Sequence, residues 1–168
     1  VVFIIGCTFV QCFLFGVFFH FHDALPKGEQ YVKTEIPGSI STKNMYTTVD
    51  KKEELEALGG YLTQNHLTEK KVLLYGEIPA ISYIFDMEPA VYTTWADLRS
   101  NTLERLQADL DAITTDYPVV IVTDAIGQEL SGNTSYVDEK LDAIAQFLSR
   151  GNYQCGYAQK GYYVYTSQ

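Results

Sequence analysis

The first 22 residues of the chain lack Asp, Glu, Lys and Arg entirely, although the whole chain carries 12 basic and 21 acidic residues. The same stretch holds seven of the nine Phe residues. A helix of 22 residues is about 33 Å long, close to the ~30 Å hydrocarbon thickness of a bilayer. We therefore expect a transmembrane helix over residues 1–23, in contact with membrane lipid through residues 1–22.

The sequence also lacks the features of two alternatives to a membrane span. No basic start, short apolar region or small-residue cleavage site marks a secretory signal peptide. A helix buried in a protein core is disfavoured, because apolar residues lie on all faces of this one and the remaining chain is too small to surround it. The chain begins with Val1 and carries no charge ahead of the apolar run, so we expect the last span of a longer protein.

Basic residues and cysteines are scarce in the rest of the chain. The net charge of −9 argues against nucleic acid or an anionic lipid surface as a partner. Cys7 and Cys12 lie in the apolar segment and Cys155 stands alone near the end, so the acidic part has no disulfide framework.

Strand and helix patterns alternate after a linker over residues 24–30. Extended segments are expected at 31–36, 72–75, 90–93 and 119–123, of which VLLY and VVIVT are of the buried, parallel kind. Helices are expected at 50–64, 79–86, 101–113 and 135–150, with Asp50, Asn101 and Ser135 as their N-caps. The Tyr-rich end of the chain predicts a hairpin that turns at Gln159-Lys160-Gly161. The sequence thus predicts a three-layer α/β domain over residues 31–168, with a mainly parallel sheet and a C-terminal β-hairpin.

Two acids are expected beyond the carboxyl ends of the strands, where ligands bind in open parallel sheets. Glu77 follows the VLLY strand and Asp124 follows VVIVT. A carboxylate pair would act as general acid and base on a glycoside, or hold a cation. The structural alternative is that Glu77 stabilises a helix N-terminus and Asp124 caps a turn.

Trp95 is the only Trp of the chain, with Asp97 two residues further on. An indole beside an acid and hydroxyl groups is a common way to hold a sugar ring, which makes both residues candidates for ligand binding. The alternatives are that Trp95 fills core or an interface, or lies at the level of lipid head groups.

Common catalytic and cofactor-binding motifs are missing. There is no G-x-G-x-x-G after a strand, no phosphate-binding P-loop and no G-x-S-x-G elbow. His66 is isolated in the acidic part, so no zinc site can be assembled there. We therefore expect no cofactor, no metal and no catalytic residue in this part. Asn133-Thr134-Ser135 fits the glycosylation acceptor pattern, but Ser135 already serves as a helix cap.

Three strings carry a resemblance to a known family: GSISTKNMYTT, VLLYGEIPAISYIFDMEPAVYTTWADLRSNT and DYPVVIV. They resemble the C-terminal extracytoplasmic domain of bacterial multispan glycosyltransferases similar to the dolichyl-phosphate-mannose-protein mannosyltransferase family. The resemblance implies an accessory domain, outside the cell membrane, of an enzyme that uses polyprenyl-phosphate sugar donors. The catalytic acids of that family lie in an early loop between membrane helices, which this sequence does not contain.

The expected function is therefore an accessory domain that binds a polyprenyl-phosphate sugar or a glycan acceptor without catalysing the transfer by itself. Two alternatives remain open at this point. One is a membrane-anchored surface module that binds a partner or a carbohydrate. The other is a hydrolase that uses Glu77 and Asp124.

Overall fold

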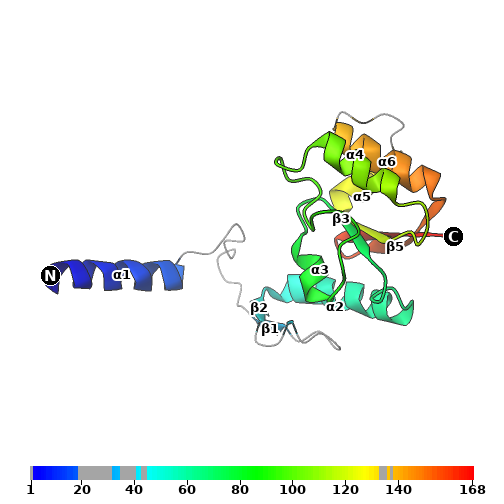
Figure 1. Cartoon of the computed structure of the whole chain (residues 1–168). Coiled ribbons are helices and arrows are strands. Elements are labelled where there is room, and N and C mark those ends of the chain that lie inside the picture. The colour runs from blue at the N-terminus through cyan, green and yellow to red at the C-terminus, as the bar shows by residue number, and fades with distance from the viewer. Residues whose placement is uncertain (1, 19–31, 35–40, 43–44, 133–135, 137) are drawn as a thin grey trace.

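The computed structural model describes residues 2–18, 32–34, 41–42, 45–132, 136 and 138–168. This part of the chain forms six helices and six strands (Figure 1). The helices are α1 (Val2–Phe18), α2 (Val49–Gln64), α3 (Ala80–Ile84), α4 (Leu103–Ala112), α5 (Asp124–Gly132) and α6 (Glu139–Arg150). The strands are β1 (Val32–Thr34), β2 (Met45–Thr47), β3 (Val72–Tyr75), β4 (Val119–Thr123), β5 (Tyr153–Gln159) and β6 (Tyr162–Ser167).

Four strands form a mixed sheet in the order β3-β4-β6-β5, while β1 and β2 form a separate antiparallel pair. β3 and β4 are parallel, with Val72 opposite Val119, whereas β6 is antiparallel to both β4 and β5. The prediction of a mainly parallel sheet is therefore wrong. The reason is that β6 inserts beside β4 in the interior of the sheet, so the hairpin contributes two antiparallel strand pairs.

The C-terminal hairpin itself is confirmed. β5 and β6 pair with Gln159 opposite Tyr162, which leaves Lys160 and Gly161 as a two-residue loop. Both loop residues have positive φ, 49° and 80°. Two successive positive φ values are typical of the type I′ turn, whose twist matches that of paired strands.

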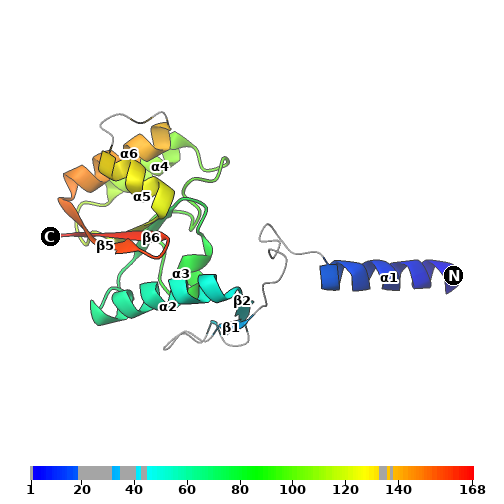
Figure 2. The ribbon, with the colours of Figure 1, turned by 180° about the vertical axis from the view of Figure 1, so that it is seen from behind.

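Helices cover both faces of the four-stranded sheet. α2 and α3 lie on one face, and α4, α5 and α6 lie on the other (Figure 1, Figure 2). Side chains of a strand alternate between faces, so the apolar residues of β4 supply both layers. Val119 and Ile121 pack with α2 and α3, and Val120 and Val122 pack with α4 and α6.

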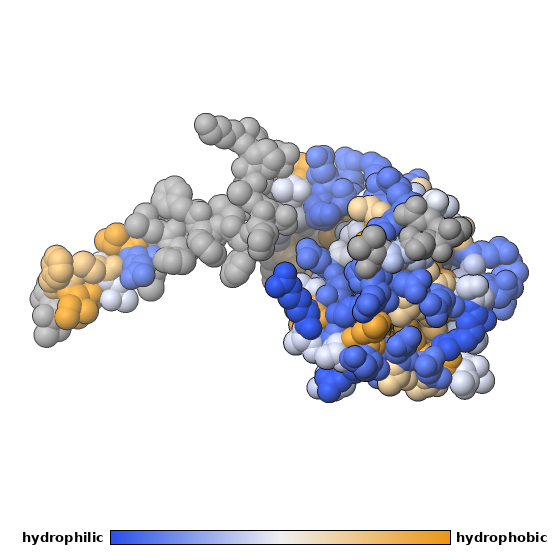
Figure 3. All heavy atoms as spheres, turned by 90° about the horizontal axis from the view of Figure 1, so that it is seen from above, coloured by the Kyte–Doolittle hydropathy of each residue, from blue (hydrophilic) through white to orange (hydrophobic). Residues whose placement is uncertain are grey.

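The predicted membrane span is not supported by the structure. α1 has 17 residues, which makes it about 26 Å long and shorter than the ~30 Å hydrocarbon core. Among the residues that the structure describes, no helix has both the length and the apolar character needed to cross a bilayer. The exposed side chains of α1 are mostly apolar and include Phe3, Ile4 and Phe9, whereas the face of the domain seen in Figure 3 is mainly hydrophilic.

Two helix caps differ from the prediction by one or two residues. Thr48, not Asp50, caps α2, because its Oγ1 accepts a hydrogen bond from the Lys51 N–H at 3.3 Å. Thr102, not Asn101, caps α4 in the same way. Asp138 caps α6. The predicted cap Ser135 and the Asn133-Thr134-Ser135 acceptor pattern lie outside the described residues.

The segment expected as a strand over 90–93 forms only an isolated bridge. Val72 of β3 bonds to both sides of Pro89, through its N–H to the Glu88 carbonyl and its carbonyl to the Ala90 N–H. The chain then leaves the sheet, since the Tyr92 N–H donates to the Asp109 carboxylate at 2.9 Å. β3 therefore stays at the edge of the sheet.

Gly60 offers a direct test of the middle of α2. It is exposed, and a Cβ placed there would meet no atom within 4 Å. We therefore expect Gly60→Ala to raise the free energy of unfolding by about 0.5–1 kcal/mol, because Ala loses less backbone entropy in a helix. Urea unfolding of the two proteins measures the change. A loss of stability would mean that Gly60 meets a neighbour that the structure does not place there.

Candidate functional site

A groove of about 450 Å³ opens where β3 ends. Its walls come from β2, the start of α2, α3 and the loop after β3. Tyr162 also contributes, and it pairs with Thr123 at the carboxyl end of β4. The groove therefore lies at the carboxyl edge of the parallel strand pair, which is the part of an open α/β sheet where ligands bind.

The groove combines an aliphatic lining with an exposed aromatic ring. Leu55 and Ile81 are buried, and Ile78 is partly buried against the same core cluster. Tyr46 is 64% exposed and the neighbouring Met45 is 38% exposed. Pockets of this kind, mostly apolar with a few polar groups, are typical of small-molecule binding sites.

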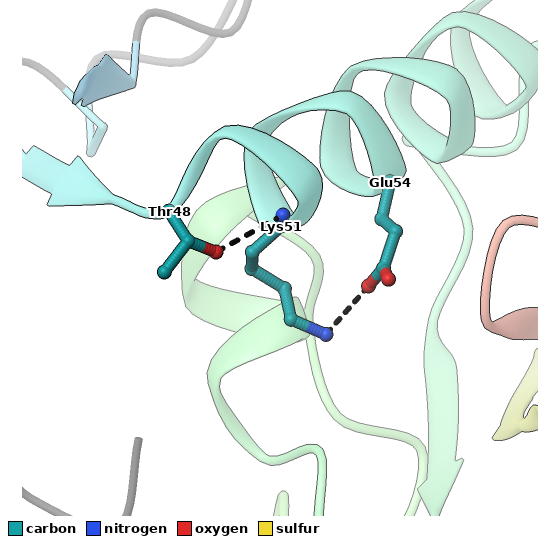
Figure 4. A network of polar contacts seen from close by, with 3 residues as sticks. All are labelled: Thr48, Lys51 and Glu54. Carbon is teal, nitrogen blue, oxygen red and sulfur yellow. Dashed lines mark hydrogen bonds and ion pairs between the residues drawn. The ribbon is translucent and has the colours of Figure 1, made fainter. Parts of the chain in front are cut away.

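Lys51 is the cation of the groove, and its position is fixed by the first turns of α2 (Figure 4). Its backbone N–H is held by the cap Thr48, and its Nζ donates to Glu54 Oε2 at 2.6 Å. The same Nζ lies 5.6 Å from the centre of the Tyr162 ring. The side chain therefore bridges α2 and the beginning of β6.

Burial and neighbouring groups act in opposite directions on the Lys51 ammonium. Burial lowers its pKa, but the hydrogen bond and the charge of Glu54, together with Tyr162, outweigh burial and raise the pKa above the ordinary value. For Tyr162, burial is the largest effect and raises the pKa of the phenol, against the opposing effect of Lys51. At neutral pH the groove therefore holds a protonated lysine beside a neutral tyrosine.

Glu77 lines the groove from the loop after β3. Its φ is 60°, a left-handed conformation that is uncommon for glutamate, and Gly76 before it has φ 106°. The Glu77 N–H donates to Asp97 Oδ2 at 2.7 Å, which holds the loop in this conformation. A Cβ at residue 76 would lie 2.5 Å from Thr123 Oγ1, so the loop also packs closely against the end of β4.

The structure thus brings together two of the four residues predicted from sequence, Glu77 and Asp97. Asp97 contacts the loop through the Glu77 N–H and is not among the lining residues of the groove. Asp124 is the first residue of α5, and its carboxylate accepts from Gln128 Nε2 at 2.6 Å. Trp95 is 38% exposed, and its backbone N–H donates to Thr93 Oγ1. Neither Asp124 nor Trp95 is among the lining residues.

A second set of polar groups lies on the opposite face of the sheet. The Tyr75 hydroxyl donates to Asp138 Oδ2 at 2.7 Å, while Asp138 Oδ1 accepts from the Lys140 N–H at the start of α6. Burial raises the pKa of Tyr75, and the hydrogen bond and charge of Asp138 raise it further. This pair ties the end of β3 to the first turn of α6, and its function is structural.

Metal binding has no support in the described part of the chain, where no group of three or more His, Cys, Asp or Glu side chains is arranged to hold an ion. Sequence reasoning missed three residues that line the groove: Tyr46, Lys51 and Tyr162. Lys51 and Tyr162 were assigned only to a helix and to the hairpin, and Tyr46 only to one of the strings that carry the family resemblance. These three residues come together only in the folded chain, where the first turn of α2, the short strand β2 and the hairpin meet.

In comparisons with known proteins, no protein-family model, no curated protein and no solved structure matches the chain. The resemblance to the extracytoplasmic domains of glycosyltransferases therefore stays a prediction from sequence.

Proposed function

We propose that the α/β domain over residues 31–168 is a non-catalytic carbohydrate-binding module that takes a glycan in the groove between β2, α2 and α3. The observation that carries the proposal is the composition of the groove. It is lined by an exposed tyrosine and by buried aliphatic side chains, and Lys51 and Glu77 supply one donor and one acceptor group.

Sugars need this combination of groups because each ring has apolar C–H faces and polar edges. The Tyr46 ring would stack on a sugar face, which aromatic rings do well because they bury a large area with little loss of side-chain freedom. Hydroxyl groups would accept from the Lys51 ammonium, which has three N–H donors, and donate to the Glu77 carboxylate. The volume of about 450 Å³ lies within the range of small-ligand pockets.

The hydrolase alternative has less support than binding without catalysis. A glycosidase needs two carboxyl groups on either side of the bond that breaks. Among the described residues that line the groove, Glu77 is the only Asp or Glu. Asp124 is hydrogen-bonded within its own helix instead.

The resemblance noted in the sequence supplies the biological context of the proposal. The module would act as an accessory domain, on the extracytoplasmic side, of a sugar transferase whose donors are polyprenyl-phosphate sugars. In that role it would hold a glycan near the transferase, and the transfer would be catalysed elsewhere.

Tyr46→Ala tests the proposal with little risk to folding, because the side chain is largely exposed. We expect the full chain to bind at least one of the neutral trisaccharides mannotriose, maltotriose and chitotriose, and Tyr46→Ala to weaken that binding about tenfold through loss of ring stacking. Calorimetric titration measures both affinities.

The matched control is Tyr83→Ala in α3. Tyr83 is 64% exposed, like Tyr46, but is not among the groove residues. Its replacement should leave the affinity unchanged. Equal losses in the two variants, or no binding of any trisaccharide by the unmodified chain, would overturn the proposed function.

A further inference from the structure

We infer that the groove selects uncharged glycans over sugar phosphates, and that Glu54 is the residue that sets this selectivity. The inference rests on the proposed function, because it names which class of sugar the same groove accepts. The resemblance implies two partners, a polyprenyl-phosphate sugar and a glycan acceptor. Of these, the glycan acceptor is the one without a phosphate.

The first argument is the charge balance of the groove. Among the described lining residues, Lys51 is the only Lys, Arg or His, and Glu77 is the only Asp or Glu. The Lys51 ammonium is already paired with Glu54 at 2.6 Å. The positive charge is therefore compensated within the protein, and the Glu77 carboxylate is left to face the ligand.

The described lysines of α2 and of the hairpin turn do not supply the missing positive charge. Lys160 in the hairpin turn pairs with Glu53 at 3.2 Å, and Lys52 pairs with Glu56 at 3.6 Å. Each described lysine at the start of α2 and in the adjacent hairpin thus has a glutamate partner. A phosphate in the groove would bind a lysine whose charge Glu54 already compensates, and it would be repelled by the Glu77 carboxylate, so its net electrostatic attraction to the groove is small.

An uncharged glycan avoids this cost. The Lys51 ammonium has three donors, and one of them bonds to Glu54 Oε2. The other two can donate to sugar hydroxyls while the ion pair stays intact. Hydroxyl groups can also donate to Glu77, which a phosphate dianion cannot do. The Lys51–Glu54 pair therefore presents donors to a neutral ligand without presenting a net positive charge.

Glu54→Gln removes the partner charge and keeps the size of the side chain. The full chain and this variant are titrated with each neutral trisaccharide and with the same trisaccharide carrying a 1-phosphate. We expect the unmodified chain to bind the neutral form at least several-fold more tightly. In Glu54→Gln, the affinity for the phosphate form should rise about tenfold, and that for the neutral form should change less than twofold, because Lys51 becomes an uncompensated cation.

The matched control is Glu56→Gln, which makes the same change of charge on the same helix. Glu56 pairs with Lys52 and does not line the groove. This variant should keep the selectivity of the unmodified chain. Circular dichroism of all three proteins verifies that the fold is retained.

The outcomes separate the inference from the function on which it depends. Binding of the phosphate form as tightly as the neutral form by the unmodified chain overturns the inference and leaves the proposed function standing. Equal gains in phosphate affinity for Glu54→Gln and Glu56→Gln would show that net charge, not the Lys51–Glu54 pair, sets the selectivity. Failure of every trisaccharide to bind overturns the proposed function itself.

Discussion

Gly127→Ala is expected to lower the free energy of unfolding by about 2–3 kcal/mol, because it overpacks the contact between α5 and the sheet. A Cβ at residue 127 would overlap the ring of Tyr163 in β6, at Cγ and both Cδ atoms. These atoms are near the root of the side chain, so a rotation of the ring alone does not remove the overlap. Either the helix or the strand has to move.

The surroundings of Tyr163 limit that movement. Its ring stacks on the Tyr165 ring, with 6.4 Å between the centroids and 23° between the planes. β6 is held on both edges, by β4 and by β5. The closely packed interior therefore transmits the displacement to the sheet instead of absorbing it.

Gly132→Ala is the matched control, since Gly132 ends the same helix and a Cβ there would meet no atom within 4 Å. We expect this variant to retain the original stability or gain up to about 1 kcal/mol. Adding Tyr163→Ala to Gly127→Ala should recover part of the loss, which a double-mutant cycle of urea unfolding would measure. Similar losses for Gly127→Ala and Gly132→Ala would contradict the close approach of α5 to Tyr163.

Strands β3 and β4 and the hairpin could be predicted because their signals are local. VLLY and VVIVT contain no charged residue, and both faces of the resulting strands are buried. The hairpin was evident from an alternating Tyr-rich stretch around a Lys-Gly turn. The arrangement of the strands was not predictable in the same way, because no local pattern says that β6 pairs with β4. This choice depends on how both faces of the sheet are covered.

The errors at helix ends have a related cause. The string TTVD offers several residues that can cap a helix, and their side chains differ little in intrinsic preference. The structure selects Thr48, which makes Lys51 the third residue of the helix, whereas a cap at Asp50 would make it the first. Lys51 therefore lies inside the first turn of α2, where its Nζ contacts Glu54 and the Tyr162 ring.

The candidate site shows the same division between local and spatial information. Glu77 was identified because it follows a strand, which is a position that can be read along the chain. Its contact with Asp97 required a loop with positive φ at both Gly76 and Glu77. Tyr46 and Tyr162 are 116 residues apart and meet only because the hairpin folds back beside α2, so no spacing rule would have paired them.

Alkaline pH is expected to unfold the domain steeply, because several buried tyrosines must stay protonated in the folded state. Burial is the main cause that raises the pKa of Tyr75, Tyr153, Tyr157, Tyr162 and Tyr165 above the ordinary value of 10.0. A phenolate inside an apolar core would lose its hydration, so the folded state disfavours the ionised form.

The sign of the effect follows from proton binding. Below pH 10 these tyrosines are protonated in both states, and their contribution to stability is fully present. Above pH 10 the unfolded chain releases protons that the folded chain retains, so stability falls as the pH rises toward the folded-state pKa values. Tyr75 and Tyr153, whose pKa values burial raises far above the ordinary value, each contribute up to about 1.4 kcal/mol per pH unit, so these two would remove about 4–5 kcal/mol between pH 10 and pH 12. This loss is comparable with the whole stability of a small domain.

Urea unfolding at a series of pH values, followed by circular dichroism and by the ultraviolet absorbance of tyrosinate, measures this slope. Tyr75→Phe should reduce the slope above pH 10 by about 1.4 kcal/mol per pH unit, since one group that titrates only in the unfolded state is removed. It should also cost about 1 kcal/mol at neutral pH through loss of the hydrogen bond to Asp138. Tyr83→Phe, at an exposed residue, should leave the slope unchanged. If the tyrosinate absorbance reaches the value for all 13 tyrosines before the chain unfolds, the buried hydroxyl groups reach water in the folded state, and the tight packing of β6 between its two helical layers would be wrong.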